Sequence, residues 1–166
     1  MFKSSRTFLS ACAALALVAA FPISGDAQEK HAHTHSTAGV AQLQLNAGNR
    51  WTTDAPLRSG MAAVRKSFEA DHPAIHAGKQ TAAQYQALAA RIEKEVQSIV
   101  ANCKLPADAD ANLHYIVADL MQGVGLMRNG DTAESRHEGA SLVHGALNAY
   151  ARFFDDPMWT PLEALH

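Results

Sequence analysis

Apolar residues recur along most of the chain at alternating steps of three and four residues, which is the spacing of one face of an α-helix. Four separate stretches show this pattern, and no stretch alternates apolar and polar residues as a half-buried strand does. The four stripes are Leu57, Met61, Val64 and Phe68; Tyr85, Leu88, Ile92, Val96 and Ile99; Leu113, Val117, Leu120, Val124 and Met127; and Ala140, Val143, Leu147, Tyr150 and Phe154. The pattern predicts four amphipathic helices.

Capping residues and prolines indicate where the first helix begins and ends. Thr53 and Asp54 can cap its start, and Pro56 suits its first turn. We expect it to end near Asp71-His72-Pro73, because proline disfavours a helical conformation in the residue before it.

The second helix begins with a capping box, since Thr81 is followed three residues later by Gln84. Its apolar stripe runs to Ile99, and the next step of the pattern falls on Cys103. The spacing therefore predicts that Cys103 faces the core in the last turn of this helix.

The remaining boundaries follow from the same signals. Pro106 interrupts the chain, and we expect Asp108 and Asp110 to cap the third helix. Asp131 is the expected cap of the fourth helix, which Asp156-Pro157 should end. Met158 and Trp159 can then fold back over the end of the bundle. Four helices of this length with short loops predict an all-α, antiparallel up-down-up-down four-helix bundle over residues 51–166.

The N-terminal residues predict an export signal. Lys3 and Arg6 precede an apolar run from Phe8 to Phe21, and Gly25-Asp26-Ala27 supplies the small residues of a cleavage site after Ala27. Residues 1–27 are therefore interpreted as a signal peptide, and the mature chain as a periplasmic protein without stable membrane insertion. A lipoprotein signal ending at Cys12 is the alternative.

Residues 28–50 have no helical periodicity, and we expect them to form a flexible tail and linker. The tail contains His31, His33 and His35, and alternate imidazoles on a short flexible segment can chelate a borderline metal ion. The formal net charge of the chain is only −2, and it has no basic stripe, so a nucleic-acid partner is not expected.

The predicted topology brings three further donors to one end of the bundle: Met61, Cys103 and His114. Together they form a donor set that suits Cu(I) and, less well, Zn(II). Removal of the signal peptide leaves Cys103 as the sole cysteine, so it can be buried, bridge two chains or bind a metal. The opposite end gathers His72, His76, Met127 and His137.

The glycines in the last two helices lower helix stability and have two possible explanations, close helix approach or room for a prosthetic group. No Glu-x-x-His motif of a di-iron bundle is identified, and Cys103 has no identifiable activating base other than His114, so catalysis is not expected. Three functions stay open. They are a copper-binding protein that sequesters or transfers the ion, a haem-binding electron carrier, and a cofactor-free bundle that acts through a periplasmic protein partner.

The segment from Gly123 to Phe154, with Leu147-Asn-Ala-Tyr150 near its end, resembles the small periplasmic b-type cytochromes with a four-helix bundle. Met61 occupies the position of that family's axial methionine. The resemblance implies haem b between Met61 and a histidine, but Ala151 stands where the family has its histidine. The substitutes available to this chain are His114 and His144.

A second resemblance covers the His-rich start, the entry from Trp51 to Met61 and the junction from Cys103 to His114. These segments resemble a group of secreted bacterial four-helix bundles described as DnrO-like. This resemblance supports the bundle and implies no particular chemistry.

Overall fold

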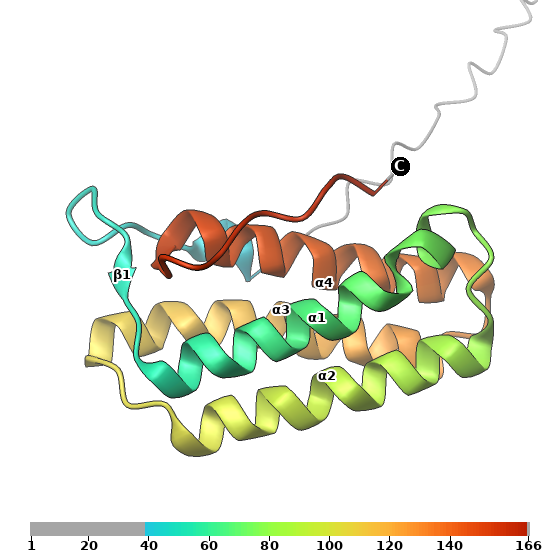
Figure 1. Cartoon of the computed structure of the whole chain (residues 1–166), viewed down its shortest axis with the longest axis horizontal. Helices are drawn as coiled ribbons and strands as arrows, with labels where there is room; N and C mark the ends of the chain where they lie inside the picture. Colours follow the sequence, from blue (N-terminus) through green and yellow to red (C-terminus); the bar gives the residue numbers. More distant parts are fainter. Residues whose placement is uncertain (1–38, 166) are drawn as a thin grey trace, which may run out of the picture. The chain divides into compact units, whose positions relative to one another are not determined.

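The computed structural model describes residues 39–165. Four long helices run antiparallel to their neighbours in the chain (Figure 1), which confirms the predicted all-α four-helix bundle. They are α1 (Ala55–His76), α2 (Ala82–Asn102), α3 (Ala107–Asn129) and α4 (Ala133–Phe153), preceded by a short 3-10 helix, η1 (Val40–Gln42). The predicted signal peptide and the predicted histidine tail, with His31, His33 and His35, lie outside the described residues.

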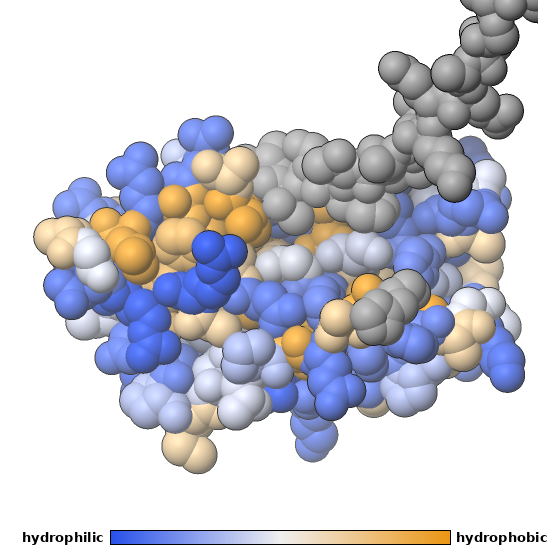
Figure 2. Space-filling view, turned by 90° about the horizontal axis from the view of Figure 1, so that it is seen from above, coloured by the Kyte–Doolittle hydropathy of each residue, from blue (hydrophilic) through white to orange (hydrophobic). Residues whose placement is uncertain are grey.

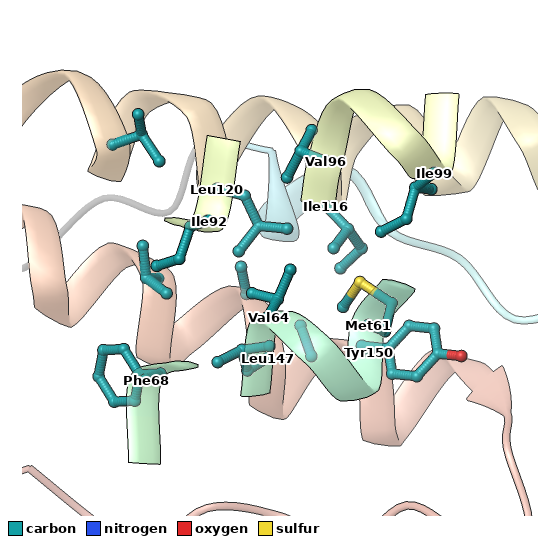
Figure 3. Packing of buried hydrophobic residues seen from close by; sticks show 14 of the residues in the cluster. Met61, Val64, Phe68, Ile92, Val96, Ile99, Ile116, Leu120, Leu147 and Tyr150 are labelled. Carbon is teal, nitrogen blue, oxygen red and sulfur yellow. The ribbon is translucent and has the colours of Figure 1, made fainter. Parts of the chain in front are cut away.

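The core is formed by the four predicted stripes. Side chains from all four helices meet between them, as Figure 3 shows for Phe68, Ile92, Leu120 and Leu147. Val117 is the exception among the predicted inward positions, since it is only half-buried and Ile116 takes the buried place in α3. None of the helices in residues 39–165 combines the length and hydrophobicity needed to cross a membrane.

Two helix starts have the predicted caps. The Asp54 carboxylate accepts a hydrogen bond from the Leu57 amide at 2.9 Å. Thr81 and Gln84 form a complete capping box, with each side chain bonded to the other residue's backbone N–H. Each such cap satisfies N–H groups that have no partner within the helix, and contributes about 1 kcal/mol.

Two predicted helix starts were wrong. At α3, Asp108 and Asp110 lie inside the first turn, where they interact with the helix dipole, and Pro106 occupies the cap position. At α4 the cap is Thr132 instead of Asp131, and its hydroxyl accepts from the Ser135 amide at 3.1 Å. The sequence offered several capping residues in a row, and only the path of the chain selects among them.

α1 continues through Pro73 to His76, beyond its predicted end. Pro73 lies within the last turn, so the helix loses few hydrogen bonds by including it, and the Pro73 carbonyl still accepts from the Ala77 amide at 3.2 Å. The extra turn also buries Ile75 completely. Burial of that side chain favours the longer helix.

The ends of the bundle contain structure that the sequence did not predict. β1 (Trp51–Thr52) pairs in parallel with β2 (Phe154–Asp155), so α4 ends at Phe153, ahead of Asp156-Pro157. Residues 39–50, expected to be a flexible linker, are bound to the bundle. The buried Asp119 carboxylate accepts from the Gly39 and Val40 amides at 2.9 and 2.8 Å, and Leu43 is buried.

α3 and α4 approach each other through two glycines. A Cβ atom on Gly123 would lie 2.5 Å from the Gly139 carbonyl oxygen, and one on Gly139 would lie 2.6 Å from the Gly123 oxygen. The two backbones are therefore in direct contact at this point. Close helix approach explains these two glycines, and no space for a prosthetic group remains between them.

Candidate functional site

A cleft of about 270 Å³ lies where the end of α2 faces the start of α3. It contains Cys103 and His114, two of the predicted metal ligands, together with the Asp110 carboxylate. Its lining residues are Val100, Cys103, Asp110, Leu113, His114 and Val117. We refer to it as the α2–α3 cleft.

Cys103 is half-buried and carries a free thiol. It is the C-cap of α2, one residue beyond the predicted last turn, and it packs against the core as the apolar pattern predicted. The helix ends one residue earlier, and the chain turns the thiol into the cleft. Burial raises the pKa of the Cys103 thiol, and the carboxylates of Asp54 and Asp110 raise it further.

The geometry around His114 fixes its tautomer. Its Nδ1 lies 2.8 Å from the Asp110 backbone oxygen and 3.5 Å from a carboxylate oxygen of the same residue. A carbonyl oxygen can only accept, so Nδ1 carries the proton and Nε2 of the neutral ring carries the lone pair. Metal-binding histidines are held in this way by a second acceptor. The side chain is 68% exposed, so an ion can reach it from solvent.

Met61 does not line the α2–α3 cleft. It is fully buried, and its sulfur points into the core near Ile116 and Tyr150 (Figure 3). The predicted set of Met61, Cys103 and His114 is therefore divided, with the last two in one cleft and the methionine in the core. Within residues 39–165, no three His, Cys, Asp or Glu side chains are arranged to hold a metal ion.

His144 lies in the middle of α4, with neighbours other than those predicted. Its ring stacks on His72 with centroids 6.4 Å apart, and His72 in turn lies 6.1 Å from His76. Nε2 of His144 lies 2.6 Å from the Glu163 backbone oxygen, so it donates its proton there. Burial lowers the pKa of His144, the bond to Glu163 raises it, and the neighbouring His72 lowers it.

The described residues do not fit a haem between Met61 and His144. Met61 is enclosed by core side chains, and the Nε2 atom of His144 is bonded to the backbone of Glu163. Gly123 and Gly139, which could have opened space for a ring system, instead bring two helices into contact.

The sequence interpretation missed the Glu-x-x-His spacing that di-iron helical bundles use. On the helices it occurs twice, at Glu69 and His72 in α1 and at Glu134 and His137 in α4. Such sites need further carboxylates from facing helices. In the part of the chain that the structure describes, no such group of three ligands is formed.

Comparisons with protein-family models, with curated proteins and with solved structures returned no match. The resemblances to the DnrO-like group and to the b-type cytochromes therefore stay predictions.

Proposed function

We propose that this chain is an exported copper-binding four-helix bundle in which Cys103 and His114 bind one Cu(I) ion in the α2–α3 cleft. The observation that supports the proposal is the pairing of a half-buried thiol with an oriented imidazole in one cleft. Thiolate sulfur and imidazole nitrogen are ligands that bind Cu(I) well.

The number of donors favours Cu(I) over Zn(II). Structural zinc sites need four protein ligands in a tetrahedral arrangement. The cleft supplies one sulfur, one imidazole nitrogen and the Asp110 carboxylate. Cu(I) is satisfied by two soft or borderline ligands, and Asp110 is already engaged in orienting His114. Zinc is the less favoured ion.

In this proposal the histidine tail, with His31, His33 and His35, captures copper ions, and the α2–α3 cleft holds one of them. Because His114 is exposed, the bound ion is also open to exchange, which suits sequestration followed by transfer.

The decisive experiment is a Cu(I) titration against a competing chelator, using protein in which His31, His33 and His35 are alanine. We expect one Cu(I) per chain, and at least a hundredfold loss of affinity in Cys103→Ala and about tenfold in His114→Gln. The matched control is His137→Gln, a half-buried histidine of α4 outside the cleft. Equal Cu(I) affinity with and without Cys103 would overturn the proposal and leave the partner-binding alternative.

The affinity should also depend on pH. Burial and two carboxylates raise the pKa of the Cys103 thiol, so at neutral pH the thiol is protonated and Cu(I) must displace that proton. Below the thiol pKa, the apparent affinity should therefore rise by about tenfold for each unit of pH increase. Cys103→Ala has no thiol proton for Cu(I) to displace, so the tenfold change in apparent affinity per pH unit that this proton causes should be lost. The same titration at pH 7 and pH 8 will measure this.

A further inference from the structure

The chain after β2 runs back along the bundle and covers the seam between α1 and α4 (Figure 1). We call residues 156–165 the C-terminal strap. α1 contacts α4 much less extensively than it contacts α2, so this seam is not closed by helix packing alone. In the view of Figure 2 the described surface is mainly hydrophilic, with small apolar patches.

A few specific contacts hold the strap. Trp159 packs edge-on against Tyr150 with ring centroids 4.8 Å apart. The Leu162 amide donates to the Asn148 side chain at 2.8 Å, and His144 donates to the Glu163 carbonyl at 2.6 Å. Two side chains of α4 therefore bind the backbone of the strap, in place of a continuous ladder of hydrogen bonds.

The closed strap leaves polar atoms without partners. Arg65 Nε, His72 Nε2 and Trp159 Nε1 are buried and form no hydrogen bond. The first two belong to α1 and the third to the strap, and the Arg65 guanidinium lies over the Trp159 ring at 5.5 Å. A buried unsatisfied polar group costs about 1–3 kcal/mol, so lifting the strap recovers hydration at three atoms. These atoms oppose closure, which the Trp159 packing and the bonds to Asn148 and His144 favour.

Two histidines lie under the strap. His72 and His144 stack across the seam, and a cleft of about 310 Å³ beside them is lined by His72, Leu162 and Glu163. Arg65 and Glu69 also line this cleft, and they pair with each other at 2.8 Å. Among the described residues, the groups that act on the charge of His144 are the Glu163 backbone oxygen, which favours it, and the His72 ring, which disfavours it. Two protonated rings here would repel each other in a half-buried site.

We propose that the C-terminal strap is a proton-operated latch, closed near neutral pH and opened as the pH falls. In the closed state the His144 ring is partly desolvated and stacked on His72, whereas in the open state water surrounds it. The open form therefore binds protons more readily, and acidification shifts the equilibrium toward it. Opening uncovers Tyr150 and the seam between α1 and α4.

Hydrogen exchange of the metal-free full chain tests the latch. The protection of the Leu162 amide against exchange is measured at pH 7 and pH 5 and corrected for the intrinsic exchange rate. The protection of core amides of α3, measured in the same way, is the reference. For each proton taken up, the opening equilibrium changes by at most about tenfold per pH unit. We expect the protection of Leu162 to fall by at least tenfold at pH 5, while that of the α3 amides stays unchanged.

His72→Gln is the informative variant, because His72 Nε2 forms no hydrogen bond to the strap and the substitution removes the ring that stacks on His144 and lowers its pKa. In this variant we expect full protection of Leu162 at pH 7 and a pH effect reduced by at least threefold. His137→Gln should behave as wild type. If wild-type Leu162 is equally protected at both pH values, or if His72→Gln retains the whole effect, the latch is overturned.

Discussion

The two seams that α4 makes with its neighbours are built in different ways. Against α3 it packs backbone to backbone, because Gly123 and Gly139 have no side chains to separate the helices. Against α1 it makes few direct contacts, and the C-terminal strap closes the seam through Trp159, Asn148 and His144.

This difference separates a rigid interface from a movable one. The α3–α4 seam gains stability from close packing over many atoms, none of which can leave without unfolding a helix. The α1–α4 seam depends on a short terminal segment that can lift while all four helices stay folded. On the side of α4 that faces α3, the packing is rigid. On the side that faces α1, the strap can move.

The largest predicted effect is at the rigid seam. Gly139→Val would place side-chain atoms within 3 Å of backbone atoms of Gly123 and Met127. Overpacking against backbone that cannot yield should lower the free energy of unfolding by about 3 kcal/mol or more. Urea unfolding followed by circular dichroism measures this loss. A change below about 1 kcal/mol would mean that the two helices can separate at little cost.

The next effect concerns the strap. Trp159→Ala removes the ring that packs on Tyr150. Since the ring is only partly buried, we expect a loss of about 1–2 kcal/mol, less than for a core tryptophan. The loss should appear mainly as faster hydrogen exchange of the Leu162 amide. If the amides of α3 lose protection to the same extent, the strap is part of the global fold and the contrast between the seams disappears.

A smaller effect is expected for Asn148→Ala, which removes the side chain that accepts from the Leu162 amide. One such hydrogen bond contributes about 1 kcal/mol, so local opening of the strap should become about fivefold more frequent. Limited proteolysis within residues 156–165 measures this opening. Gln86→Ala serves as the control, because its weak 3.4 Å bond to the Arg128 carbonyl lies outside the strap.

The smallest predicted effect is a gain in the stability of the protein. Gly125 lies in α3 near the rigid seam, but a Cβ atom there would meet nothing within 4 Å. Gly125→Ala should therefore stabilise the protein by about 0.5–1 kcal/mol through helix propensity alone. Thermal unfolding of this variant beside Gly139→Val tests whether the contact, and not the glycine as such, sets the cost.

The candidate site could be predicted in part. The junction between the second and third helices identified Cys103 and His114, and both line one cleft. Met61 could not be assigned correctly, because an apolar stripe does not distinguish a methionine that lines a cleft from one in the core. The hydrogen bond between His144 and Glu163 could not be foreseen either, since it depends on where a segment after the last helix lies.

The sequence by itself determined the four helices and most of the core. Helical periodicity is a local property, and the side chains it selects must be buried together. Tertiary structure alone decided the extension of α1 through Pro73, the pairing of β1 with β2 and the path of the strap. These features depend on contacts between residues far apart in the chain, where burial and hydrogen bonding outweigh local preference. The stacked histidines beneath the strap result from the same long-range contacts.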